Sequence, residues 1–140
     1  MKKNLVIMSL VVVFGLLAAL AYAGSSVGMR INVPFDFYLE DQLIPTGEYQ
    51  FAMDSNNHAT ASQVTLWSTQ GAVQKIVLTS PGTERNTTAN QLSFNKYGKR
   101  YFLSTVSIGG HKATVKVHKL EKELRAQMEK NPAVITVAQK

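Results

Sequence analysis

The fold of this chain is decided first by residues 30–40, which read RINVPFDFYLE. Apolar side chains recur at every second position from Ile31 to Leu39, with mostly polar residues between them. This period of two predicts a β-strand with one buried face. Pro34 falls on the outward-facing phase, and proline cannot donate a hydrogen bond to a sheet. We therefore expect this strand to lie at a sheet edge, or to be broken at Pro34 by a bulge into two shorter strands.

A turn and a second alternating strand follow directly. Residues 43–47, LIPTG, combine a proline that presets φ with a glycine, which predicts a turn. Tyr49, Phe51 and Met53 then alternate with polar or small residues, which predicts a strand. The Pro-x-Gly-x-Tyr pattern of residues 45–49 is similar to a turn of prealbumin-like β-sandwiches, and the similarity implies that the tyrosine packs behind the turn.

The rest of the chain adds short strands and one helix. Leu120, Leu124 and Met128 recur every four residues among charged side chains, which predicts a helix over about Lys119–Lys130 that Pro132 ends. Glu121 and Arg125 are spaced for an i,i+4 ion pair on this helix. Further strands are predicted over residues 64–68, 72–79, 92–94, 101–108, 113–117 and 133–138. Seven or eight short strands and a helix indicate a mainly β, single-domain β-sandwich or small barrel with one C-terminal α-helix.

The N-terminal residues read as an export signal. Lys2 and Lys3 precede an apolar run from Leu5 to Leu20, and residues 21–23 form an Ala-x-Ala pattern. These features predict a signal peptide over residues 1–23 and a single β domain over residues 24–140. The alternative is an uncleaved membrane anchor, since a tilted helix of about 17–20 apolar residues can span a bilayer. After cleavage we expect a periplasmic or extracellular protein with no membrane span.

Charge is unevenly distributed along the domain. Residues 96–140 hold ten basic and three acidic side chains, whereas residues 24–95 hold three basic and six acidic ones. Such a split can mark a surface for anionic partners. The alternative is a solvated basic helix face that keeps the protein soluble. The expected partners are polysaccharide, an anionic envelope component or another protein, and an export signal argues against nucleic acid. The chain has no cysteine, which excludes disulfides, thiol chemistry and lipidation at a lipoprotein cysteine.

The best candidate for a binding site is the predicted hairpin over residues 96–101. Aromatic and basic side chains interleave there around Gly98. Aromatic rings stack on sugars or cations, and bases pair with anionic groups. The alternative is that one tyrosine packs in the core while the bases keep the hairpin tip soluble. The candidate binding residues are Lys96, Tyr97, Lys99, Arg100 and Tyr101.

The sequence patterns that would indicate a catalytic site are weaker than the pattern that indicates a binding site. His58, His111 and His118 lack the spacing of a metal motif, and the sequence has no Gly-x-Ser-x-Gly element. The carboxylates Asp36, Glu40, Asp41 and Glu48 cluster near one pair of turns, and we interpret them as solvent-facing charges that protect a sheet edge. We therefore expect a non-catalytic structural or binding protein of the cell envelope, with no cofactor and no metal. The alternative is a small secreted hydrolase or carbohydrate-active enzyme that joins a histidine to one of these carboxylates.

The strand that contains Pro34 and the strand over residues 133–138 are candidates for pairing with another copy through their edges.

Three segments resemble a family of small exported bacterial proteins of unknown function. They are residues 33–49, residues 92–103, which read LSFNKYGKRYFL, and residues 119–124, which read KLEKEL. The resemblance implies a signal peptide followed by one compact β domain. It brings no activity, cofactor or catalytic residue.

Overall fold

A computed structural model describes residues 26–54, 62–71, 74–81, 89–128 and 131–140. The predicted signal peptide, residues 1–23, lies outside these ranges. The described strands are β1 (Ser26–Val33), β2 (Phe37–Leu39), β3 (Gln42–Ile44), β4 (Gly47–Asp54), β5 (Ser62–Ser68), β6 (Gln74–Pro81), β7 (Gln91–Tyr97), β8 (Arg100–Ile108), β9 (His111–Val115) and β10 (Ala133–Ala138). One helix, α2 (Lys119–Gln127), precedes β10.

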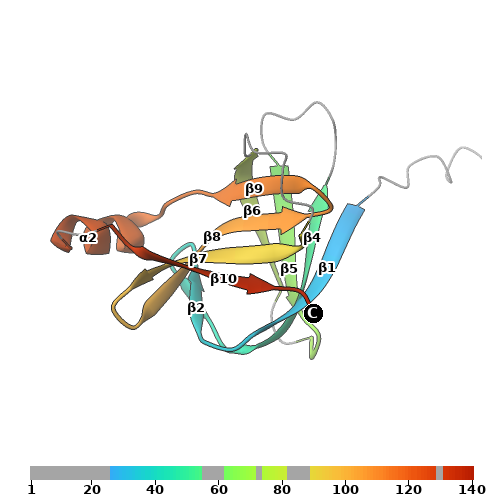
Figure 1. Cartoon of the computed structure of the whole chain (residues 1–140), viewed down its shortest axis with the longest axis horizontal. Helices are drawn as coiled ribbons and strands as arrows, with labels where there is room; N and C mark the ends of the chain where they lie inside the picture. Colours follow the sequence, from blue (N-terminus) through green and yellow to red (C-terminus); the bar gives the residue numbers. More distant parts are fainter. Residues whose placement is uncertain (1–25, 55–61, 72–73, 82–88, 129–130) are drawn as a thin grey trace, which may run out of the picture.

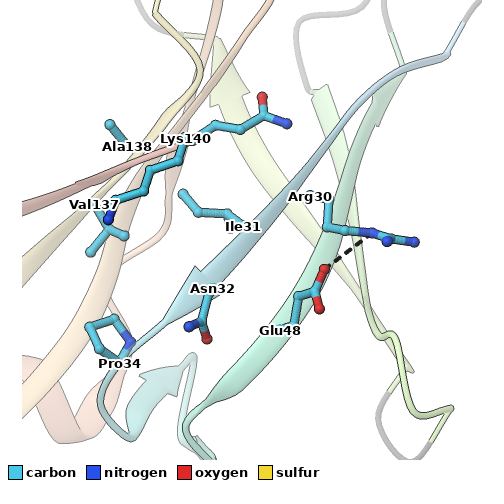
Figure 2. A pocket seen from close by; sticks show the side chains of 9 residues that line it. Arg30, Ile31, Asn32, Pro34, Glu48, Val137, Ala138 and Lys140 are labelled. Carbon is cyan, nitrogen blue, oxygen red and sulfur yellow. Dashed lines mark ion pairs between the residues drawn. The ribbon is translucent and has the colours of Figure 1, made fainter.

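The strands follow one continuous hydrogen-bonded path that folds over on itself into two layers (Figure 1). The first layer has the order β1-β4-β5-β6, and the second has the order β10-β7-β8-β9, with the β2–β3 hairpin attached to β8. The layers join where β6 pairs with β9, and their strands cross steeply, as in orthogonal packings. At the opposite margin β1 and β10 lie side by side without pairing (Figure 2). Of the two predicted architectures, the described residues adopt the sandwich.

Pro34 follows an edge strand, as predicted, and the alternating stretch is also divided into two strands, with a bend at Phe35 in place of the predicted bulge. β1 ends at Val33, β2 begins at Phe37, and β1 is an edge strand. The turn predicted over residues 43–47 is shorter than expected, because Leu43 and Ile44 belong to β3. These two short strands, β2 and β3, raise the number of described strands above the predicted seven or eight.

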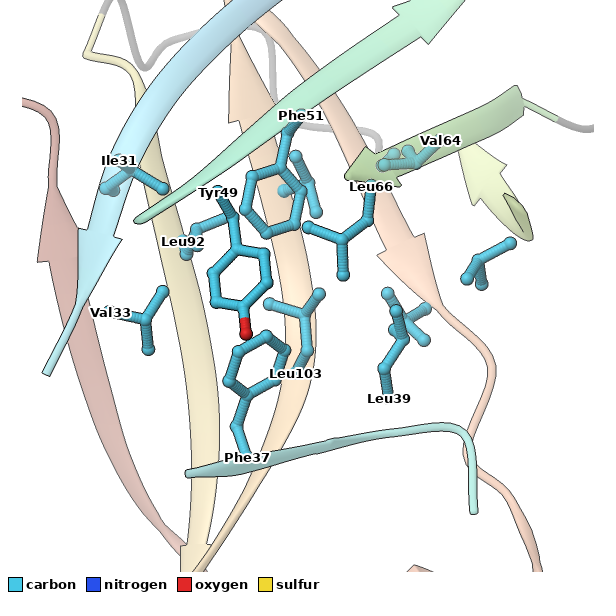
Figure 3. Packing of buried hydrophobic residues seen from close by; sticks show 14 of the residues in the cluster. Ile31, Val33, Phe37, Leu39, Tyr49, Phe51, Val64, Leu66, Leu92 and Leu103 are labelled. Carbon is cyan, nitrogen blue, oxygen red and sulfur yellow. The ribbon is translucent and has the colours of Figure 1, made fainter. Parts of the chain in front are cut away.

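The core lies between the two layers and is built from the alternating apolar residues of the predicted strands. Ile31 and Val33 of β1 and Tyr49 and Phe51 of β4 point into it, as do residues of β2, β5, β7 and β8 (Figure 3). The largest fully buried side chains of this core are Phe37, Phe51, Phe94, Leu39, Ile44, Leu66, Leu92 and Ile108. Each buried leucine or phenylalanine contributes about 1.5–3 kcal/mol of transfer free energy, and the chain has no cysteine, so packing of this core is the main contribution that opposes the loss of conformational entropy.

Tyr49 packs behind the turn that precedes its strand, as the Pro-x-Gly-x-Tyr pattern implies. Its hydroxyl donates a hydrogen bond of 2.6 Å to the carbonyl oxygen of Pro45. The Thr46 hydroxyl donates to the carbonyl of Val33 at 2.9 Å, and the Thr46 amide donates to Asp36 Oδ1 at 2.7 Å. These bonds tie the start of β4 to the bend between β1 and β2.

Candidate functional site

The hairpin that carries the candidate binding residues forms as predicted. β7 and β8 pair from Gln91↔Ser107 to Tyr97↔Arg100, and Gly98 and Lys99 make the turn. Gly98 has a φ of 60°, and Lys99 is not in the left-handed region. A positive φ at the first turn position alone is the type II′ geometry, which favours glycine there.

Strand alternation divides the candidate residues between two faces of the hairpin. Tyr97 and Arg100 are cross-strand partners and point to the outer face of the second layer, away from the core. Lys96 and Tyr101 are the next partners and point to the opposite face. Lys99 lies at the tip. The interleaving seen in the sequence therefore does not become one continuous aromatic and basic surface.

Tyr97 is buried, with only 3% of its surface exposed. Its hydroxyl donates to Glu121 Oε1 of α2 at 3.2 Å, and its ring meets that of Phe102 edge to face at 5.7 Å. The expectation that Tyr97 contributes to an exposed binding patch is wrong, because α2 covers this part of the outer face. Of the two predicted roles for the hairpin tyrosines, burial is the one that Tyr97 adopts.

Tyr101 is half-buried at the rim of the core. Its ring stacks on Phe35 with centroids 4.0 Å apart and an interplanar angle of 16°. Lys96 Nζ lies 5.4 Å from the Tyr101 centroid, within the range of a cation–π contact. Lys96 and Tyr101 therefore stabilise each other.

Lys99 and Arg100 are the exposed part of the candidate site. No carboxylate that the structure describes lies within ion-pair distance of either side chain. They are thus available to an anionic partner.

A row of paired residues crosses the outer face beneath α2. Four cross-strand pairings form this row and lead from β10 to β3: Val134↔Asn95, Asn95↔Phe102, Phe102↔Tyr38 and Tyr38↔Leu43. The rings of Tyr38 and Phe102 stack at 4.9 Å, and α2 covers the middle of the row through Glu121. Val134 and Leu43, at the two ends, are 65% and 52% exposed.

Glu121 is the buried polar centre of this contact, with 5% of its surface exposed. Its Oε1 accepts hydrogen bonds from Asn95 Nδ2 at 2.9 Å and from the Tyr97 hydroxyl. Sequence reasoning missed this role and assigned Glu121 to an ion pair with Arg125. The i,i+4 ion pair seen on the helix joins Lys119 and Glu123 at 3.9 Å. The position of Glu121 beside the apolar stripe of Leu120 and Leu124 could have indicated burial.

Burial, together with the Glu121 carboxylate, raises the pKa of Tyr97 above the ordinary value of 10.0. The folded chain then keeps a proton that the unfolded chain releases. The resulting stabilisation is fully present below pH 10 and is lost as the pH rises through the folded pKa of Tyr97. In an absorbance titration at 295 nm of residues 24–140, we expect Tyr97→Phe to remove ionisation amplitude above pH 10. Loss of amplitude below pH 10 would contradict the buried position.

A second polar cluster lies where the β2–β3 turn meets β6 and the start of α2. Glu40 pairs with Lys75 Nζ at 3.0 Å and lies 3.6 Å from His118 Nε2. Lys75 also donates to the carbonyl of Leu39, and Asp41 Oδ1 accepts from the Leu120 amide at 3.2 Å. Glu40 has a φ of 58°, the left-handed region that non-glycine residues rarely adopt. The cluster joins the two layers and holds the N-terminus of α2.

The other histidines and carboxylates that the hydrolase alternative could use are dispersed. Asp36 is bound to the Thr46 amide, and Glu48 pairs with Arg30 at 3.3 Å. His111 is exposed in β9, and His58 lies outside the described residues. Among the described side chains, no group of three or more histidines and carboxylates is arranged to hold a metal ion.

Comparison of the chain with family models, curated proteins and solved structures found no match. The resemblance to the family of exported proteins stays a prediction. Within the described part of the chain, no helix combines the length and apolar character that a membrane crossing needs.

Proposed function

We propose that this chain is an exported, non-catalytic binding protein of the cell envelope, whose basic end takes an anionic envelope component. The proposal is supported by the difference between the described carboxylates, which have ion-pair or hydrogen-bond partners, and the bases of the hairpin tip, which have none described. Every carboxylate whose side chain the structure describes is engaged in an ion pair or hydrogen bond: Asp36, Glu40, Asp41, Glu48, Glu121 and Glu123. Lys99 and Arg100 have no such described partner, so the unpaired charge at the hairpin tip is positive.

The position of these bases also supports the proposal. The hairpin tip and α2 lie at the same end of the molecule (Figure 1), where α2 contacts Tyr97, next to Gly98 in the chain. Lys122 is exposed on α2 and has no described ion-pair partner. Phosphate or carboxylate groups on a headgroup or an acidic polysaccharide would match this surface.

The experiment measures binding of residues 24–140 to vesicles with and without anionic lipid and to an acidic polysaccharide. Each basic residue near an anionic surface contributes about 1 kcal/mol, so we expect Lys99→Gln and Arg100→Gln each to weaken binding about fivefold. Lys112→Gln on β9, which lowers the net charge equally, is the control and should leave binding unchanged. Equal loss in all three variants would indicate an effect of net charge alone, and absence of wild-type binding to every surface would refute the proposal.

A small hydrolase stays the alternative, because His118 lies 3.6 Å from Glu40. Glu40 is also paired with Lys75, however, and Asp41 is bound to a helix amide, so both carboxylates have structural partners. Turnover of ester or glycoside substrates by the wild type, with its loss in His118→Ala, would favour the hydrolase over the binding protein.

A further inference from the structure

The margin at which β1 and β10 face each other is an open seam. Among the strands that the structure describes, each of these two has a partner on one side only: β1 pairs with β4, and β10 pairs with β7. A hollow of about 520 Å³ lies between them, lined by residues 30–32, Pro34 and Glu48 on one side and by residues 137–140 on the other (Figure 2). Unpaired sheet edges carry free amides and carbonyls that can pair with another chain.

The direction of the strands shows what can fit. From β1 to β10 the path through β4, β5, β6, β9, β8 and β7 takes seven antiparallel pairings. An odd number of reversals leaves β1 and β10 antiparallel across the seam. β1 and β10 come into contact along the seam, which leaves less than the two strand spacings of about 4.8 Å each that pairing with both edges needs. An extended segment would therefore pair with β1 alone and lie against β10.

The lining of the hollow has an apolar floor and a charged rim. Ile31 is buried in the core, Val137 packs against it, and Pro34 is exposed beside them. At the rim, Arg30 is paired with Glu48, and Lys140 has no described ion-pair partner. This pattern suits a strand with apolar side chains on one face and an acidic side chain on the other.

We propose that the seam binds an extended segment of a partner protein, with alternating apolar residues and an acidic residue, by strand addition. The charge of the rim favours a partner protein over a second copy. The carboxylates that the structure describes in this chain are already engaged, so a second copy offers none of them to Lys140. Antiparallel pairing of two β1 strands centred on Arg30 would also place like charges opposite each other, which is destabilising.

The test is an NMR titration of ¹⁵N-labelled residues 24–140 with a capped heptapeptide. The peptide has valine at its even positions and threonine at its odd positions, except for a glutamate at the fifth. Strand addition should shift signals of β1 and β10 and slow amide exchange at alternate β1 residues at least tenfold, because only every second amide points to the seam. A peptide with N-methylated valines, which lacks about three of the seven backbone N–H donors, is the matched control and should not bind.

Binding should also depend on the charge at the fifth position of the peptide. Exchanging the peptide glutamate for lysine should weaken binding to the wild-type protein about fivefold. In Lys140→Gln, the two peptides should bind with nearly the same affinity. Lys99→Gln at the hairpin tip should change nothing, so this result is separable from that for the anionic envelope ligand. The proposal would be overturned if the NMR signals shift but alternate β1 amides are not protected from exchange. It would also be overturned if no signal shifts at millimolar peptide. Concentration-dependent dimers with protected β1 or β10 amides would overturn it in favour of a second copy.

Discussion

Replacing Glu121 by alanine is expected to lower the free energy of unfolding by about 2–3 kcal/mol, because the buried Tyr97 hydroxyl and the half-buried Asn95 amide lose their acceptor. Asn95 Nδ2 and the Tyr97 hydroxyl both donate to Glu121 Oε1, and α2 keeps water away from Tyr97. Urea unfolding of residues 24–140 measures the loss. Hydrogen exchange of the α2 amides should rise in the folded state, since Glu121 is the only fully buried side chain of the helix.

Glu123→Ala is the matched control on the same helix. Glu123 is exposed, and its ion pair with Lys119 is of the surface type, so its removal should cost less than about 0.5 kcal/mol. Glu121→Gln keeps an acceptor oxygen and should fall between the two alanine variants. If Glu121→Ala and Glu123→Ala cost the same, Glu121 does not anchor the helix.

The sandwich could be predicted because its strands are patterned locally. Ile31, Val33, Tyr49, Phe51 and Met53 all occupy the buried phase that their alternation predicts. The alternation of β8 is less regular, because a bulge opposite Ser93 and Phe94 shifts the register. The core-facing side chain is Leu103 before the bulge and Val106 after it, so the buried phase of β8 changes from odd to even positions. A bulge of this kind has no signature in a pattern of period two.

The candidate site could be predicted only in part, because the burial or exposure of its side chains depends on contacts with residues that are distant in the chain. The phase of Leu92 and Phe94 places Tyr97 on the outer face, which sequence reasoning treats as solvent. α2 returns to that face and buries Tyr97 through Glu121, 24 residues further along. His118 and Glu40 likewise meet only because α2 docks beside the β2–β3 turn. Lys99 and Arg100 stay exposed, because they lie at the turn that α2 leaves uncovered.

The second large effect is expected for Phe37→Ala, which should lower the free energy of unfolding by about 3–5 kcal/mol. Phe37 is fully buried, and its ring meets those of Tyr49 and Phe94 edge to face at 5.9 and 5.4 Å. Tyr49 belongs to the first layer and Phe94 to the second, so Phe37 holds the two layers together from the short β2 strand (Figure 3). Urea unfolding followed by far-ultraviolet circular dichroism and by tryptophan fluorescence measures the effect.

Tyr38→Ala separates this role from a general weakening of β2. Tyr38 is the next residue, points to the outer face and stacks on Phe102, so its loss affects the contact beneath α2 and leaves the core between the layers intact. Because Tyr38 is only half-buried, we expect its removal to cost less than half as much as that of Phe37. Trp67 reports on β5 in the first layer, whereas Phe37 lies in the second. Coincident transitions in Phe37→Ala would show that the layers unfold as one unit, and a fluorescence transition left at its wild-type midpoint would contradict the coupling.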